Sequence, residues 1–371
     1  MSAGPLAGAL GPLAAVLGGA VLGVLVSHAV WWLVRVEGGA TEDLPAAPRI
    51  RPAGIGAAVA FGLWWWEVVC GGQLPATSGA VSAAGALHAR FVAHMLLLAL
   101  IAAASWIDFR LRVIPDAITL PGVVAGMLAA WLVPGQLLPV AVEVPRSFAV
   151  PLVEVDVLAA AGGLNTASAP SWLAARPEWW GLVTMTVIVA AWWWVCTPGG
   201  YGPRQEGLRR ALGAVLAVAM AAAWWGGGRA HGGLMASLVG IAAGGGLVWA
   251  TRAGASLAMG REAMGLGDVT LMAMVGAWLG WQAAVITFFL GVFLGAGFAA
   301  VRRAVDDDTE MPFGPSLGLG AAVTLVAWRP LWAAFGPSFE RPLELVAVLG
   351  LVVVLTAVAL AALQWWRRVR S

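Results

Sequence analysis

Two acidic residues stand at the ends of apolar segments, where a charged side chain is least expected. Asp108 ends one such segment within SWIDFRLRVIPDAITLP (residues 105–121), and Asp268 begins another within GREAMGLGDVTLMAMVGAWLGW (residues 260–281). An ionisable group at membrane depth costs several kcal/mol unless it is paired or hydrated. Both aspartates are therefore candidates for a functional site.

The chemistry open to these two aspartates is acid–base catalysis. They lie 160 residues apart in the sequence but at the same predicted membrane boundary, so helix packing could bring them together. Two neighbouring carboxylates resist ionising together, so one keeps a proton as general acid and the other acts as general base on a water molecule. An aspartyl protease needs this arrangement.

The rest of the chain indicates an all-α, polytopic bundle of transmembrane helices. Of its 371 residues, 61% are hydrophobic and 11% are charged, and the mean hydropathy is +0.87. A soluble protein would carry roughly a quarter of charged residues. Apolar runs of about 20 residues, the length that a helix needs to cross a bilayer, recur along the chain. We predict a single integral membrane domain over residues 1–371.

About eleven spans are predicted, within a range of eight to eleven. They lie near residues 6–34, 53–70, 90–107, 117–138, 179–197, 210–226, 232–251, 269–282, 283–301, 313–333 and 343–364. Arginines concentrate in alternate loops, and basic residues are enriched on the cytoplasmic side of a membrane. This pattern predicts an outside N-terminus, a cytoplasmic C-terminus, and a cytoplasmic boundary for both aspartates.

Several residues beside the aspartates have plain structural explanations. Gly265 and Gly267 lack a Cβ atom, which lets the backbone turn tightly and lets a substrate strand approach Asp268. Pro115 ends the preceding segment, and Asp116 can cap a helix that begins one residue later. We therefore interpret Asp116 as a helix cap in preference to a catalytic group.

Two glutamates allow more than one interpretation. Glu262 precedes the Gly-x-Gly-Asp motif, and it could form a solvated pair with Arg261 or contact the charged leader of a substrate. Glu67 lies toward the outer end of the second span without a motif around it. We expect Glu67 to reach outward to the interface or to meet a neighbouring helix.

Three blocks of sequence together resemble the type IV prepilin leader peptidases, the bacterial members of the Gly-x-Gly-Asp membrane aspartyl proteases. The blocks are IDFRLRVIPDAITLP, AMGLGDVTL followed by GAWLGWQA, and MPFGPSLGLGA (residues 311–321). The resemblance covers roughly residues 90–130 and 255–335. It implies that Asp108 and Asp268 form the catalytic pair and that Glu262 belongs to the family's Glu-Ala-Met-Gly pattern. Phe313, Gly314 and Pro315, in the third block, are expected to shape the start of the tenth span.

The same resemblance implies a catalytic core over residues 90–335, with an extra exterior loop and helix pair at about 139–226. The family commonly has a cytoplasmic domain with paired CxxC elements after its first span, tied to N-methylation of the cleaved product. Here residues 35–52 form a short loop without cysteine, so we expect no methyltransferase activity. Thr270 also stands where the family usually has Lys, which removes a positive charge near the aspartates.

The implied activity is an aspartic endopeptidase of the bacterial inner membrane, which removes the leader of type IV prepilins or pseudopilins at the cytoplasmic face. Its partners would be that substrate and the lipid bilayer, with pilus or secretion assembly proteins as a further option. The basic residues form no stripe, so we predict no nucleic-acid partner. Dispersed histidines and two cysteines predict neither a metal site nor a cofactor.

Two other functions stay compatible with the sequence. A proton-coupled membrane carrier could use the same two aspartates as relay groups, although carriers usually hold such acids near the middle of the membrane. A catalytically inactive scaffold related to the peptidases is the second alternative. Cleavage of a pilin-like substrate separates the peptidase from both.

Overall fold

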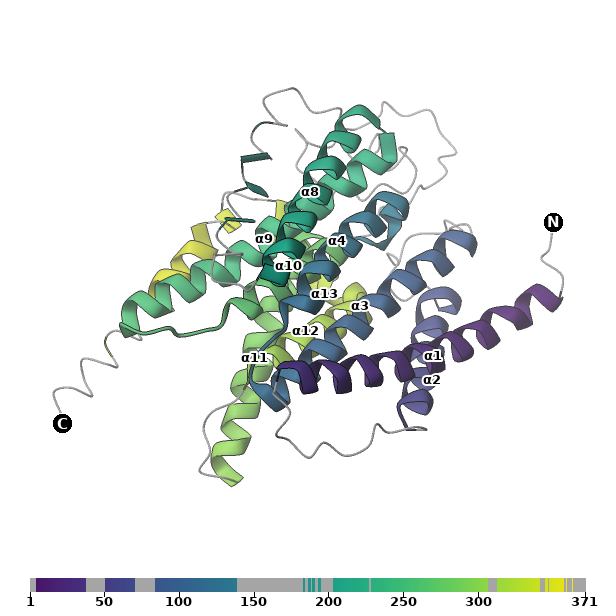
Figure 1. The fold of residues 1–371 in the computed structure, drawn as a ribbon, viewed down its shortest axis with the longest axis horizontal. Helices are drawn as coiled ribbons and strands as arrows, with labels where there is room; N and C mark the ends of the chain where they lie inside the picture. Colours follow the sequence, from purple (N-terminus) through teal and green to yellow (C-terminus); the bar gives the residue numbers. More distant parts are fainter. Residues whose placement is uncertain are drawn as a thin grey trace.

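The computed structural model describes residues 5–37, 51–70, 84–138, 203–226, 228–305 and 312–340, with parts of 183–194 and 344–362. The described residues form helices and their connections, which confirms the all-α polytopic bundle (Figure 1). The predicted exterior loop at 139–178, most of the span at 179–197 and the loop at 38–50 lie outside the described residues.

The N-terminal part of the bundle contains four α-helices and two short segments. These are α1 (Pro5–Glu37), α2 (Arg51–Trp64), the π-helical η1 (Trp65–Val69), α3 (Ala84–Leu111), α4 (Asp116–Leu132) and the 3-10 turn η2 (Pro134–Gln136). Among the described residues between 203 and 340, the C-terminal part contains six α-helices and one 3-10 segment. These are α8 (Pro203–Gly226), α9 (Gly228–Met259), α10 (Leu266–Leu279), α11 (Trp281–Val305), α12 (Gly314–Val326), α13 (Trp328–Phe335) and η4 (Gly336–Glu340).

Five of the described helices are long and apolar enough to cross a membrane. They lie at Gly11–Arg35, Arg51–Val69, Leu87–Leu111, Gly232–Met259 and Trp281–Arg302. The bent pair Gly314–Val326 and Trp328–Phe339 makes a sixth if it is one broken span, and α4 and α10 are shorter apolar helices. The chain is a membrane protein, and the number of about eleven spans stays a prediction.

Helix α10 forms the centre of the bundle. It packs against α9, α4, α11, α3 and α12, and every residue from Asp268 to Leu279 is buried. A helix that is apolar on all sides belongs in a protein core or in the bilayer, and here neighbouring helices surround it. Gly240 of α9 and Gly276 of α10 let two of these backbones touch, because a Cβ on either glycine would collide with the other's carbonyl oxygen.

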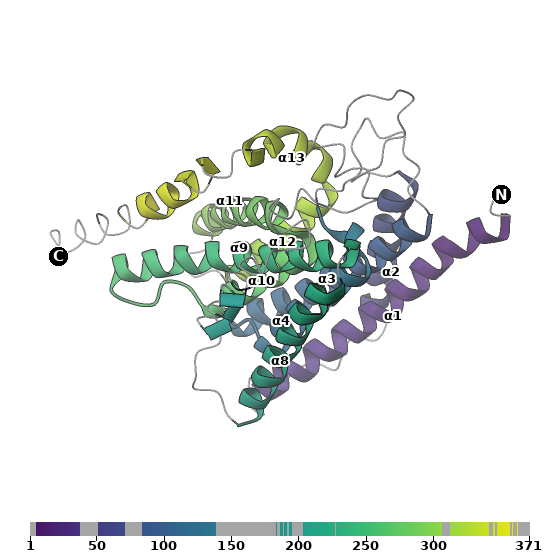
Figure 2. The same ribbon diagram turned by 90° about the horizontal axis from the view of Figure 1, so that it is seen from above.

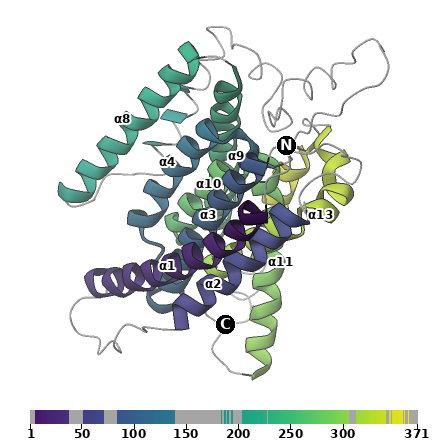
Figure 3. The same cartoon turned by 90° about the vertical axis from the view of Figure 1, so that its right-hand side faces the viewer.

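Helices α1 and α2 lie outside this centre. Figure 2 shows α1 on one side of the bundle and α13 on the opposite side, with α9, α10 and α3 between them. Figure 3 looks onto the face that α1 and α2 cover, with α8 and α11 on opposite flanks. Large apolar side chains of α1 are exposed, among them Leu17, Val21 and Leu25, which is typical of a helix that faces lipid.

Several predicted spans differ from the structure in their bounds or continuity, and two of these differences have a local cause. The span expected at 313–333 is broken, since α12 and the segment after it meet at 88°. Pro330 explains this break, because a proline ring clashes with the carbonyl four residues earlier, at Val326. Gly280, with φ at 89°, ends α10 and starts α11 at Trp281, two residues before the predicted boundary.

Candidate functional site: two aspartates at helix ends

The backbone at Asp108 is fixed by the way α3 ends. Arg112 adopts a left-handed conformation (φ 57°), and its N–H donates to the carbonyl of Asp108 at 2.8 Å. This 5→1 bond is a common way to terminate a helix. It satisfies a carbonyl in the last turn of α3 and stops the helix just after Asp108.

The Asp108 carboxylate points toward the start of α12. The backbone N–H of Gly314 donates to Asp108 Oδ2 at 2.9 Å, and Asp108 is only 5% exposed. The first N–H groups of a helix lack partners within it, and they favour a negative charge at this end. The carboxylate of α3 thus completes the N-terminus of α12.

Asp268 lies in the first turn of α10, three residues after the N-cap Gly265. It is 8% exposed. The ends of α3, α10 and α12 pack together here, because α10 contacts both α3 and α12. The structure thus places both aspartates at one end of the bundle, and their action as a pair stays a prediction. Among the described residues, no hydrogen bond reaches the Asp268 carboxylate, in contrast to Asp108.

Ile114, in the connection between α3 and α4, lies against both halves of this site. A Cβ placed on Gly267 would lie 2.7 Å from Ile114 Cβ, and one placed on Gly314 would lie 3.0 Å from Ile114 Cδ1. Gly267 is therefore required by this close approach. Gly265 has φ at −70°, and a Cβ there would make only ordinary contacts, 3.9 Å from Gly267 N and 4.0 Å from Asp268 Oδ2, so neither backbone conformation nor space requires a glycine at this position.

The segment before Asp268 is held by a residue that the sequence analysis missed. Arg252 of α9 donates from Nε to the Met264 carbonyl at 2.8 Å and from Nη2 to Glu262 Oε1. Glu262 thus pairs with Arg252, and the pair with Arg261, one of its two possible roles, is not among the ion pairs of the described residues. Ser256 accepts the N–H of Ala263 at 3.1 Å from the same helix.

Thr270, which replaces the family's usual Lys, joins α10 to α4. Thr119 of α4 donates to Thr270 Oγ1 at 2.9 Å, and Thr270 donates to the Gly267 carbonyl at 3.0 Å. Both threonines are fully buried. This relay ties the first turn of α10, which includes Asp268, to its neighbour.

The prediction for Asp116 needs a correction. Helix α4 begins at Asp116 itself, and the N-cap residue is Pro115, which has an extended backbone and no capping side chain. Asp116 is therefore the first helical residue, where its negative charge still interacts favourably with the helix dipole. Pro115 is compatible with this position because its φ is −71°.

Glu67 does not reach outward. It is fully buried in η1, and its Oε1 lies 2.7 Å from His94 Nδ1 of α3, so it meets a neighbouring helix. His94 Nε2 lies 2.8 Å from the Gln136 carbonyl. Buried Arg90, one turn before His94, attracts Glu67 electrostatically. This cluster of Glu67, Arg90, His94 and Gln136 is a second buried polar centre.

The fold and the two aspartates define a class of protein, a polytopic helical membrane protein with a carboxyl pair at its helix ends. Residues 209–300 match the type IV leader peptidase family. The resemblance of this chain to the type IV prepilin leader peptidases is thus confirmed over that segment. The match includes Arg252, Glu262 and Asp268, whereas Asp108 lies outside it.

Named relatives agree with this family. Part of the chain is similar to the prepilin leader peptidase/N-methyltransferases of Aeromonas hydrophila (36% identity over 94 residues, 24% of this chain and 32% of the relative) and Escherichia coli K12 (34% over 96 residues, 25% and 43%). That of Pseudomonas aeruginosa is 41% identical over 73 residues, 19% of this chain and 25% of the relative. The similarity thus spans less than half of each relative. No solved structure matches the chain.

Proposed function

We propose that this protein is an aspartic endopeptidase that removes the leader peptide of type IV prepilins or pseudopilins. The observation that supports the proposal is that Asp108 and Asp268 are both buried at helix ends that pack together, with Ile114 against Gly267 and Gly314 between them. The match of residues 209–300 to the type IV leader peptidase family supports the substrate class. No cofactor enters the proposed reaction.

The two carboxyl groups have different surroundings, which suggests their roles. Asp108 accepts a backbone N–H from Gly314, which favours its charged form, so it acts as the general base. It takes a proton from a water molecule as the oxygen attacks the peptide carbonyl. Asp268 carries the shared proton and donates it to the carbonyl oxygen. Breakdown of the tetrahedral intermediate then transfers a proton to the leaving amine.

The proposed site lies at the cytoplasmic face of the bacterial inner membrane, with the N-terminus outside and the C-terminus in the cytoplasm. Alternating arginine-rich loops support this orientation. The catalytic core spans residues 90–335 and carries an extra segment at about 139–226. Substrate, bilayer and pilus or secretion assembly proteins are the proposed partners.

The proposed enzyme cleaves without methylating. Relatives are named as both peptidase and N-methyltransferase, but residues 35–52 of this chain contain no cysteine. Glu262 supports the site through Arg252, together with Gly267 and Pro115 beside the aspartates. Acids at 306–308, another candidate for reading the leader's charge, lie outside the described residues.

The test is co-expression of the full chain with a pilin-like substrate, followed by gel mobility and mass spectrometry of the mature N-terminus. We expect a shortened, unmethylated product with the wild type, and none with Asp108→Asn or Asp268→Asn. Asp116→Asn is the matched control and should cleave normally. Cleavage that survives both substitutions would exclude the aspartyl mechanism. Absence of cleavage with several substrates would favour the inactive scaffold. A methylated product would contradict the proposal that the enzyme lacks methyltransferase activity.

A further inference from the structure

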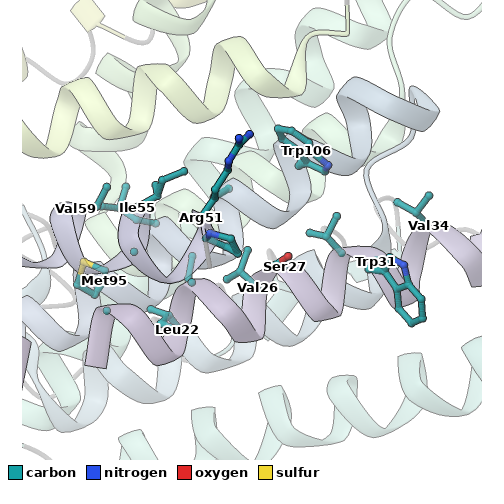
Figure 4. Close-up of a pocket in the computed structure, with 18 of the residues that line it drawn as sticks. Leu22, Val26, Ser27, Trp31, Val34, Arg51, Ile55, Val59, Met95 and Trp106 are labelled. Carbon is teal, nitrogen blue, oxygen red and sulfur yellow. The ribbon is translucent and has the colours of Figure 1, made fainter. Parts of the chain in front are cut away.

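A separate cavity of about 550 Å³ lies between α1, α2 and α3. Figure 4 shows side chains from these helices around it, including Leu22 and Val26 of α1, Ile55 of α2 and Met95 of α3. Its walls are mainly apolar, and neither Asp108 nor Asp268 lines it. We call this cavity the α1–α3 groove.

One end of the groove is basic and aromatic. Arg51, the first residue of α2, and Arg110, in the last turn of α3, both line it, together with Trp31 and Trp106. The Arg110 guanidinium lies 5.8 Å from the centre of the Trp106 ring. On α1, the Arg35 guanidinium lies 3.8 Å from the centre of the Trp31 ring. Arginine and tryptophan together are typical of the level where lipid headgroups lie.

We propose that the α1–α3 groove binds one anionic phospholipid. The acyl chain would lie along the apolar wall, and the phosphate would contact Arg51 and Arg110. The start of α2 adds backbone N–H groups to the same end, and helix N-termini bind phosphates readily. A lipid therefore matches both the length of apolar wall and the charge at its end.

The charge of the groove distinguishes this occupant from the proposed substrate. The leader that the family resemblance implies is basic, and Arg51 with Arg110 would repel it. A second copy of the chain would bring its own Arg51 and Arg110 to the same place if the contact were symmetric. An anionic lipid is the partner whose charge complements the two arginines.

The groove also lies on the helix that carries Asp108. Trp106 and Arg110 flank Asp108 in the sequence, but they line the groove, whereas the Asp108 carboxylate bonds Gly314 of α12. A bound lipid would thus pack against the opposite side of the same helix end. The lipid site does not depend on the proposed peptidase activity.

The experiment is native mass spectrometry of the full chain after incorporation into nanodiscs with equal amounts of phosphatidylglycerol and phosphatidylcholine. We expect the wild type to retain phosphatidylglycerol selectively. The double variant Arg51→Gln/Arg110→Gln should retain about tenfold less, because each basic residue near a membrane surface contributes several-fold to anionic lipid binding. Arg329→Gln, an exposed arginine of α13 outside the groove, is the matched control and should match the wild type.

A second variant keeps the charges and fills the space. Ala102 lines the groove and is exposed, so Ala102→Phe should displace the acyl chain without altering either arginine. Equal retention of both lipids by the wild type, or unchanged retention by the double variant and by Ala102→Phe, would overturn the proposal. A cross-link from Ser27→Cys in the groove to the pilin-like substrate or to a second copy would also overturn it.

Discussion

Helix α3 carries two buried ionisable centres that differ in their charges. Near its start, His94 lies 2.7 Å from the carboxylate of Glu67, and the buried Arg90 attracts the same acid electrostatically, so this acid has basic neighbours. Fourteen residues later, about 21 Å along the helix, Asp108 shares one end of the bundle with a second carboxyl group, Asp268, in the first turn of α10. One centre balances its charges and the other places like charges together.

The difference indicates which centre is structural and which one is chemical. A carboxylate with basic neighbours is stabilised as it stands, and both ring nitrogens of His94 have an oxygen within hydrogen-bond distance, at Glu67 and at the Gln136 carbonyl. Two adjacent carboxyl groups instead need a shared proton, and such an arrangement serves acid–base catalysis. The sequence motifs surround only the second centre.

The largest effect is expected from removing one or both of the carboxyl groups of Asp108 and Asp268. Asp108→Asn, Asp268→Asn and the double variant should each lower cleavage by about a thousandfold or more, and equally, because a pair that acts as a unit is non-additive. Thermal unfolding in detergent should occur at the wild-type temperature or above it, since a buried carboxyl group is neutralised. Additive losses in cleavage would show that the aspartates act separately.

Removing the Glu67 carboxylate should lower stability and leave cleavage unchanged, the opposite of removing either aspartate. Glu67→Ala leaves Arg90 and His94 buried without the carboxylate, and breaking a buried ion pair typically costs about 3–5 kcal/mol. We expect a large drop in the unfolding temperature and in the amount of folded protein. Cleavage per folded molecule should stay near the wild-type value. A matched Glu344→Ala variant controls for loss of an acid elsewhere in the chain.

Sequence reasoning identified Asp108 and Asp268 because each stands in a local motif at the end of an apolar run. It could not identify Gly314 as a partner of Asp108, since 206 residues separate them and only the packing of α3 against α12 joins them. Arg252 resembled a loop arginine on the cytoplasmic side, and the sequence holds no signal that it reaches Met264. Motifs locate reacting groups, whereas the groups that orient them depend on tertiary contacts.

The contact between Asp108 and α12 can be tested through Gly314. A Cβ at this position would lie 2.5 Å from Asp108 Oδ2, so Gly314→Ala must displace the carboxylate. A misplacement of about 1 Å can cost on the order of a hundredfold in rate, and we expect a loss of that size in the turnover number. Gly350→Ala is the matched control, because a Cβ there meets open space. An unchanged turnover number would exclude a role for this contact.

The loop before Asp268 should show a weaker effect. Arg252→Gln removes the charged pair with Glu262 and the bond to the Met264 carbonyl, which lets the segment before α10 move. We expect turnover to fall by about tenfold, in line with a charge-assisted hydrogen bond of about 1.5–3 kcal/mol. Glu262→Gln should lower turnover less than Arg252→Gln does, since Arg252 keeps its bond to the Met264 carbonyl. A rise in the Michaelis constant alone would instead indicate that Glu262 contacts the substrate.

The smallest expected effect concerns Thr119 and Thr270, the relay that stands where the family usually has a lysine near the aspartates. Thr270→Val removes the bond from Thr119 and the bond to the Gly267 carbonyl, and we expect a loss of about 1 kcal/mol in unfolding free energy. Thr119→Val should cost about the same, and the double variant should cost less than the sum, because both changes remove one shared bond. Cleavage should change less than threefold, since neither hydroxyl touches Asp108 or Asp268. If Thr270→Val alone abolished cleavage, the relay would be part of the proton chemistry, and the separation between the structural centre and the chemical centre would have to be redrawn to include α4.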